Sequence, residues 1–91
     1  MPQKKLLLFK KPGCMPCEVM ERELSIVLND ITAIPDLTVI DLSEHPEIGE
    51  KMDIQSTPAL LFVNDGKLVD VIHGVVNREY LRKSLQNFIN L

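Results

Sequence analysis

The hydrophobic pattern at the start of the chain predicts a buried strand followed by an amphipathic helix. Residues 6–9 form an unbroken apolar run, which is typical of strands buried on both faces. From Pro16 to Leu28, apolar residues recur at helical spacing and polar residues fill the other positions. Pro16 suits the first turn of this helix, because its missing N–H has no intrahelical partner there. We therefore expect a central strand over residues 6–9 and a helix that ends near Asn29.

The middle of the chain predicts a strand and a short helix. Residues 37–42 are apolar or β-branched apart from Asp41, which interrupts the run, and polar stretches flank them, which predicts a second buried strand. Residues 47–52 predict a helix, and Pro46 just before them is suited to be its first helical residue. Because Gly49 lowers helix propensity, we expect this helix to be short.

The last third of the chain predicts a β-hairpin and a closing helix. Residues 59–63 and 68–72 are apolar runs, and the stretch between them contains Asp-Gly, a strong hairpin signal. A final helix is expected to begin near Asn77, whose side chain suits an N-cap. Its apolar positions fall on one face, which predicts that this face is buried. The residues on it are Leu81, Leu85, Phe88 and Ile89.

The order of these elements, β-α-β-α-β-β-α, indicates one α/β sheet with helices on both faces. The first two strands would be parallel through a right-handed crossover, and the hairpin would add two antiparallel strands. The chain has 91 residues, of which 45% are hydrophobic and 25% charged, as in an ordinary globular protein. We expect a single domain over residues 1–91. A net charge of -3 argues against nucleic acid as the main partner.

The sequence contains no recognisable targeting or membrane-spanning segment. The four-residue apolar run at residues 6–9 is shorter than the roughly 7–15 residues of a secretory signal, and no run approaches the roughly 20 of a membrane span. We therefore expect a cytoplasmic protein that does not bind membranes. We also expect it to be a monomer. In that compartment, a C-x-x-C pair is more often catalytic or metal-binding than a structural staple.

The two cysteines of the chain, Cys14 and Cys17, lie at the junction between the first strand and the first helix. A thiol near a helix N-terminus is favoured as a thiolate, which indicates a thiol–disulfide oxidoreductase. A buried pair of inert thiols is one alternative. A mononuclear zinc site is disfavoured because His45 and His73 lie too far apart in sequence, so no metal is expected in one chain. Two such chains could share an iron–sulfur cluster.

Three motifs together resemble the thioredoxin superfamily. The stretch at residues 14–17, Cys-Met-Pro-Cys, resembles its C-x-P-C motif, and Thr57-Pro58 before the third strand resembles its cis-proline loop. Ile72-His73-Gly74 resembles its closing strand and glycine. The resemblance covers most of the chain and implies a minimal thioredoxin fold with a four-stranded mixed sheet in the order 2-1-3-4.

The resemblance also implies roles for individual residues. Cys14 would attack a substrate disulfide and Cys17 would resolve the mixed disulfide, so that a reversible Cys14–Cys17 disulfide replaces any bound cofactor. The backbone of Thr57 would pair with an extended substrate segment. The charges of Lys10 and Lys11 would add to the stabilisation of the thiolate. The residues expected to contact substrate are Met15, Pro16, Ser56, Thr57, Pro58, Gly74 and Val75.

The sequence departs from the thioredoxin pattern in its proton-handling residues. Gly13 stands where thioredoxins place a tryptophan, and Leu8 where many carry a buried acid. Asp41 is a candidate substitute base that would act on Cys17 through water, and a solvated aspartate without that role is the alternative.

The expected activity is the reduction of protein disulfides, with electrons from a donor of the thioredoxin-reductase type. Glutathione is the alternative donor, but the Gly-Gly and acidic pair with which glutaredoxins hold it is missing from residues 73–77. A thioredoxin-fold binding module without catalysis is the alternative of a different class.

Overall fold

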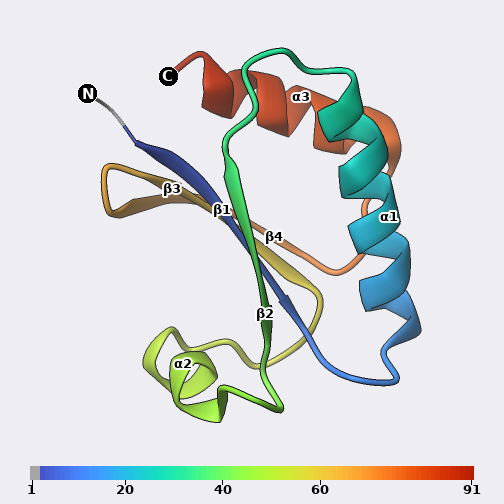
Figure 1. The fold of residues 1–91 in the computed structure, drawn as a ribbon, viewed down its shortest axis with the longest axis vertical. Helices are drawn as coiled ribbons and strands as arrows, with labels where there is room; N and C mark the ends of the chain where they lie inside the picture. The colour runs from blue at the N-terminus through green and yellow to red at the C-terminus, as the bar shows by residue number, and fades with distance from the viewer. Residues whose placement is uncertain (1–2) are drawn as a thin grey trace.

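The computed structural model describes residues 3–91 as one four-stranded sheet with three helices (Figure 1). The strands follow the spatial order β2-β1-β3-β4, with β1 parallel to β2 and the other pairs antiparallel. This arrangement confirms the predicted element order and sheet topology. The elements are β1 (Lys4–Lys10), α1 (Met15–Asn29), β2 (Asp36–Asp41), α2 (Pro46–Lys51), β3 (Ala59–Asn64), β4 (Lys67–His73) and α3 (Arg78–Ile89).

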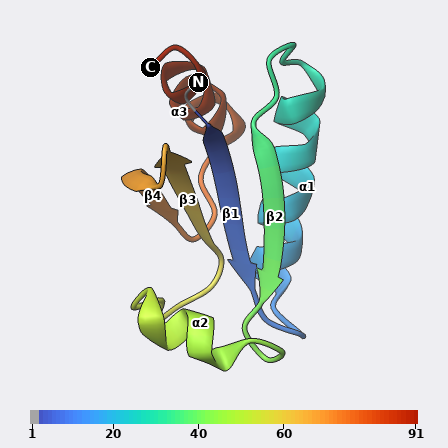
Figure 2. The ribbon, with the colours of Figure 1, turned by 60° about the vertical axis from the view of Figure 1, so that its left-hand side comes forward.

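Helices α1 and α3 cover one face of the sheet, and α2 lies at the carboxyl end of β2 (Figure 2). The main core lies between the sheet and helices α1 and α3. It is built from Leu6, Leu8, Met20, Leu24, Val27, Leu28, Leu60, Phe62, Ile72, Leu81, Leu85 and Phe88. Ile89, which was expected on the buried face of α3, is only partly buried. Burial of this apolar surface is the main stabilising contribution to the fold.

The opposite face of the sheet carries a smaller core. Phe9, Leu42, Ala59 and Leu61 are buried there, and Ile48 of α2 packs against them. Helices therefore lie on both faces, as predicted, but α2 has only six residues. Because it is so short, the side chains of this face that lie farther from it, such as Val63, are only partly buried.

The prediction that the second strand is buried was wrong. Four of the six residues of β2 are exposed, and Leu37 and Val39 keep 39% and 40% of their surface accessible. The strand lies at the edge of the sheet and pairs only with β1. An apolar, β-branched run indicates strand conformation, but it does not distinguish an edge strand from a central one.

The turns and caps form as the sequence predicts. Asp65 and Gly66 join β3 to β4 and both have positive φ angles, 53° and 80°, as a two-residue hairpin turn requires. Asn77 caps α3 by accepting a hydrogen bond from the Tyr80 N–H. Pro46 is the first residue of α2. In residues 3–91, none of the helices is both long and apolar enough to cross a membrane.

Candidate active site

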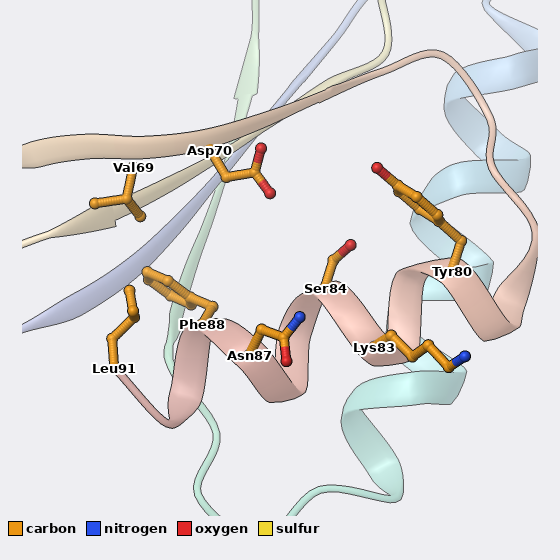
Figure 3. Close-up of a pocket in the computed structure, with 8 residues that line it drawn as sticks. All are labelled: Val69, Asp70, Tyr80, Lys83, Ser84, Asn87, Phe88 and Leu91. Atoms are coloured by element: carbon orange, nitrogen blue, oxygen red, sulfur yellow. The ribbon is translucent and has the colours of Figure 1, made fainter.

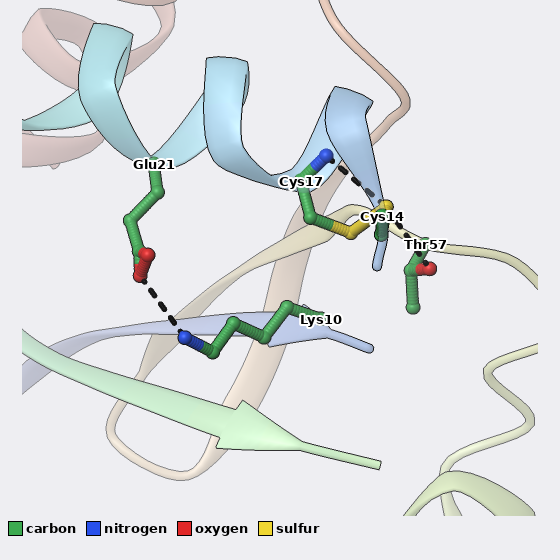
Figure 4. Close-up of a disulfide and its surroundings, with 5 residues drawn as sticks. All are labelled: Lys10, Cys14, Cys17, Glu21 and Thr57. Carbon is green, nitrogen blue, oxygen red and sulfur yellow. Dashed lines mark hydrogen bonds and ion pairs between the residues drawn. A yellow bond between two sulfur atoms is a disulfide. The ribbon is translucent and has the colours of Figure 1, made fainter. Parts of the chain in front are cut away.

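The Cys14–Cys17 pair lies where β1 gives way to α1. Cys14 is the N-cap of α1, in an extended conformation, and Pro16 occupies the first turn, as predicted. The Sγ atom of Cys14 accepts a hydrogen bond from the Cys17 N–H at 3.1 Å, so the sulfur takes the place of a capping oxygen (Figure 4). The two residues form a disulfide, with their Cα atoms 5.2 Å apart.

The two cysteine residues differ in accessibility. Cys17 is 2% exposed, whereas Cys14 is partly exposed at the helix start. Thiol–disulfide exchange requires the attacking thiolate to reach the substrate sulfur. The difference therefore supports Cys14 as the attacking residue and Cys17 as the resolving residue.

The loop before β3 approaches the disulfide from a distant part of the chain. The Thr57–Pro58 peptide bond is cis, which confirms the conformation that the thioredoxin resemblance implied. The Thr57 hydroxyl lies 3.7 Å from Cys14 Sγ and donates a hydrogen bond to it. Pro58 is fully buried, and its carbonyl oxygen accepts a hydrogen bond from the Gly74 N–H at 2.9 Å. The structure thus links the cysteine turn, the proline loop and the end of β4.

The hydrogen bond from Thr57 predicts an effect on the reactivity of Cys14. Replacing Thr57 by Val keeps the shape of the side chain but removes a donor to the sulfur. With the net value of such a bond at about 0.5–1.5 kcal/mol, we expect Thr57→Val to slow alkylation of reduced Cys14 near neutral pH by about three- to tenfold. The rate of iodoacetamide labelling, followed by mass spectrometry, measures this effect. Thr57→Ser keeps the hydroxyl and is the control; equal labelling of the Val and Ser variants would contradict the prediction.

The other predicted contact residues form an accessible rim around this group. Met15 is 71% exposed, and Pro16, Ser56 and Val75 are also exposed. Gly74 has a φ angle of 75°, which favours glycine at this position. The rim is thus open to solvent and includes large apolar side chains, which suits a protein surface as ligand.

Asp41 lies at the predicted end of the sheet, directly across from Lys10 in the parallel pairing of β1 and β2. Its Oδ1 atom accepts hydrogen bonds from the Ser43 hydroxyl at 2.7 Å and from the Ser43 N–H at 2.8 Å. The hydroxyl contact is the main reason that the pKa of Asp41 lies below its ordinary value, and the charge of Lys10 contributes. A carboxylate held in this way takes up a proton less readily. The role of Asp41 as a base remains a prediction.

An ion pair that the sequence reasoning missed lies beneath α1. Lys10 Nζ is 3.6 Å from Glu21 Oε1, so the end of β1 is joined to the second turn of α1 (Figure 4). The alternation of Leu6, Leu8 and Lys10 along β1 was the available signal, because alternate residues of a strand share a face. Lys11, by contrast, lines a hollow beside α2.

Two further observations delimit the site. In the described part of the chain, no group of three or more His, Cys, Asp or Glu residues is arranged to hold a metal ion. A hollow of about 480 Å³ lies between β4 and α3, with Tyr80, Phe88 and Val69 among its lining residues (Figure 3). None of the predicted site residues lines it.

Comparison with known proteins agrees with this geometry. Residues 2–87 match the family model described as Thioredoxin. The thioredoxin of Staphylococcus haemolyticus is 28% identical over 85 residues, which are 93% of this chain and 82% of that protein. The NADPH-dependent thioredoxin reductase 3 of Arabidopsis thaliana is 27% identical over 85 residues, 93% of this chain and 16% of that protein.

The fold comparison is independent of close sequence similarity. A solved thioredoxin-2, described as a component of malaria parasite protein secretion machinery, superposes with a TM-score of 0.86 at 15% identity and covers 94% of this chain and 84% of its own. The alternative of a binding module in which the cysteines are incidental is not favoured, because the disulfide lies at the helix start of this fold. The family match over residues 2–87 and the paired cysteines show that this chain belongs to the thioredoxin family and is a thiol–disulfide oxidoreductase.

Proposed function

We propose that this chain reduces disulfides of cytoplasmic proteins and that a thioredoxin reductase which uses NADPH restores its dithiol. The observation that carries the proposal is the juxtaposition of the Cys14–Cys17 disulfide with Thr57 and the cis-proline loop. The enzyme acts as a monomer, and the disulfide is its only redox group.

The reaction is a two-step exchange. The Cys14 thiolate attacks one sulfur of the substrate disulfide, which forms a Cys14–substrate disulfide and releases the other substrate sulfur as a thiolate that takes a proton from water. Cys17 loses its proton and attacks Cys14 Sγ, which forms the Cys14–Cys17 disulfide and releases the second substrate thiolate. The substrate gains two electrons and the enzyme loses two. The reductase then returns two electrons and two protons.

Two observations support a protein as substrate and a reductase as donor. The apolar rim that includes Met15 and Val75 offers more contact area than a small thiol needs. Residues 73–77 lack the glycine pair and acids with which glutaredoxins hold glutathione. The similarity to a protein named as an NADPH-dependent thioredoxin reductase agrees with this electron source.

A coupled assay tests the electron source. Reduction of a protein disulfide is followed by NADPH consumption, once with thioredoxin reductase and once with glutathione and glutathione reductase. We expect turnover with the first system and little with the second. The reverse result would replace the reductase by glutathione, while the disulfide chemistry of Cys14 and Cys17 would stand.

Substitution of Asp41 tests its role as base. Because its pKa is lowered, Asp41 is ionised above its ordinary pKa of 3.8 and stays ionised somewhat below it. Its titration therefore falls outside the range from about pH 5 to pH 8. As a weak base for Cys17 it would contribute up to about a hundredfold, so Asp41→Asn is expected to slow resolution uniformly across that range, measured by stopped-flow. An unchanged rate would end this assignment.

A further inference from the structure

Lys10 is the charged side chain of β1 that lies beneath α1, the helix that contains Cys17. Leu6 and Leu8 point into the core under α1 and α3, and Lys10 follows on the same face. Its Nζ atom pairs with Glu21 of α1 at 3.6 Å, with 37% and 39% of the two side chains exposed. The pair therefore lies at the edge of the packed layer between β1 and α1, partly shielded from solvent.

This pair lies next to the resolving cysteine. Glu21 follows Cys17 by four residues, so the two side chains share one face of α1. Figure 4 shows the stem of Lys10 running beneath Cys17, while its ammonium group points away from the sulfurs toward Glu21. The Cys14 sulfur receives hydrogen bonds from Thr57 and from the Cys17 N–H. Within residues 3–91, the Cys17 sulfur receives none from a protein donor.

The resolving step requires a negatively charged Cys17 thiolate, and the surroundings of Cys17 offer little to stabilise that charge. Cys17 is 2% exposed, and burial disfavours a thiolate without a partner. The neighbours that face Lys10 are Glu21 from α1 and Asp41 from β2, both acidic, and β3 contributes the apolar Leu60 to the same side of the sheet. Lys10 is therefore a cation beside this helix turn that can offset the charge of a Cys17 thiolate.

We propose that Lys10 is a redox-linked positioning residue, whose ammonium group pairs with Glu21 while the disulfide is intact and turns toward Cys17 when that thiol ionises. The proposal rests on the two-step exchange above. Partly exposed ion pairs contribute little net stability, and the Lys stem is flexible, so releasing Glu21 costs little. Glu21 restrains the cation, and the thiolate that resolves the mixed disulfide competes for it.

A two-phase reaction separates the two cysteines. The reduced protein is mixed in a stopped-flow instrument with an aromatic disulfide that releases a coloured thiolate. Attack by Cys14 releases one coloured thiolate and leaves the other bound as a mixed disulfide; attack by Cys17 then releases the second and forms the Cys14–Cys17 disulfide. The pH dependence of the second phase reports the ionisation of Cys17 in the mixed disulfide.

The two partners of the ion pair predict opposite effects. Lys10→Met should move the pH midpoint of the second phase upward by about one unit and slow it up to about tenfold near neutral pH. Glu21→Gln should move the midpoint downward, because it frees the cation. Lys10→Arg should restore most of the wild-type behaviour. Lys83→Met, which removes an exposed lysine of α3, is the control for a general change in charge and should leave the midpoint in place.

The signs decide between an electrostatic and a merely structural role. Shifts of the same sign for Lys10→Met and Glu21→Gln, or no shift for either, would overturn the proposal. A thermal melt of each oxidised variant verifies that the fold is intact. Failure of the proposed dithiol function would look different, because the wild-type protein itself would then show no second phase.

Discussion

Cys14→Ser should reduce the rate of protein-disulfide reduction to the level of the uncatalysed reaction, a loss on the order of a thousandfold or more. A serine hydroxyl is not ionised near neutral pH and does not form a disulfide, so neither step of the exchange can begin. Cys14 is partly exposed and its sulfur receives two hydrogen bonds in the structure, which is why we expect it to be the attacking group. NADPH consumption with a protein disulfide as substrate measures the loss.

The matched variant Cys17→Ser should fail at the second step. It retains Cys14, so it should still attack the substrate and then accumulate a mixed disulfide that intact-protein mass spectrometry detects. If the mixed disulfide accumulates with Cys14→Ser instead, Cys17 is the attacking residue and Cys14 the resolving one. In the reduced wild-type protein at mildly acidic pH, Cys14 should be alkylated far faster than Cys17, because the latter is buried. Equal and slow labelling of both would contradict catalysis.

The architecture was predictable because local signals and long-range packing agree in most of the chain. The continuous apolar run in β1 corresponds to a strand at the centre of the sheet, where both faces are covered. The turn at Asp65 and Gly66 and the cap at Asn77 are set by chemistry within a few residues. The exposure of β2 was not predictable from its own residues, since it depends on its place at the edge of the sheet, which only the strand order implied by the thioredoxin resemblance supplied.

The active site, too, was predictable only in part. The cysteine turn is encoded locally, and the positions of Thr57 and Pro58 were accessible through the thioredoxin resemblance. Contacts between polar side chains were not predicted. Ser43 donates a hydrogen bond to Asp41, and Lys10 forms an ion pair with Glu21, 11 residues further along the chain. Such contacts depend on the rotamers and on the spacing between helix and sheet, which a hydrophobic pattern does not specify.

These electrostatic contacts bear on how the chain handles protons without the buried acid. Leu8 is fully buried beneath α1, so the position that is acidic in many thioredoxins contributes only packing here. Charged side chains are found two residues further along the same face of β1, where Lys10 lies beside Glu21 and Asp41. These charged groups are partly exposed, and in the proposal above Lys10 acts on Cys17 through its charge.

The stability of the domain should depend most strongly on the aromatic contact between sheet and helix. Phe62 of β3 is fully buried, and its ring meets that of Phe88 of α3 edge to face, with centroids 5.3 Å apart. Phe62→Ala leaves a cavity beneath α3 and is expected to lower the free energy of unfolding by about 3–5 kcal/mol. Small domains have about 5–15 kcal/mol in total, so the variant should be only marginally folded.

Urea denaturation of the oxidised protein measures this loss as a lower midpoint at an unchanged slope. The matched control is Leu68→Ala on the neighbouring strand β4, where the side chain is 55% exposed and the expected change is within about 0.5 kcal/mol. Because β3 begins directly after Pro58, loosening it should also release the loop that holds Thr57 against Cys14. Phe62→Ala is therefore expected to slow alkylation of reduced Cys14 as well, whereas Leu68→Ala should not. Equal denaturation midpoints for the two variants would mean that this core contact does not dominate the stability of the domain.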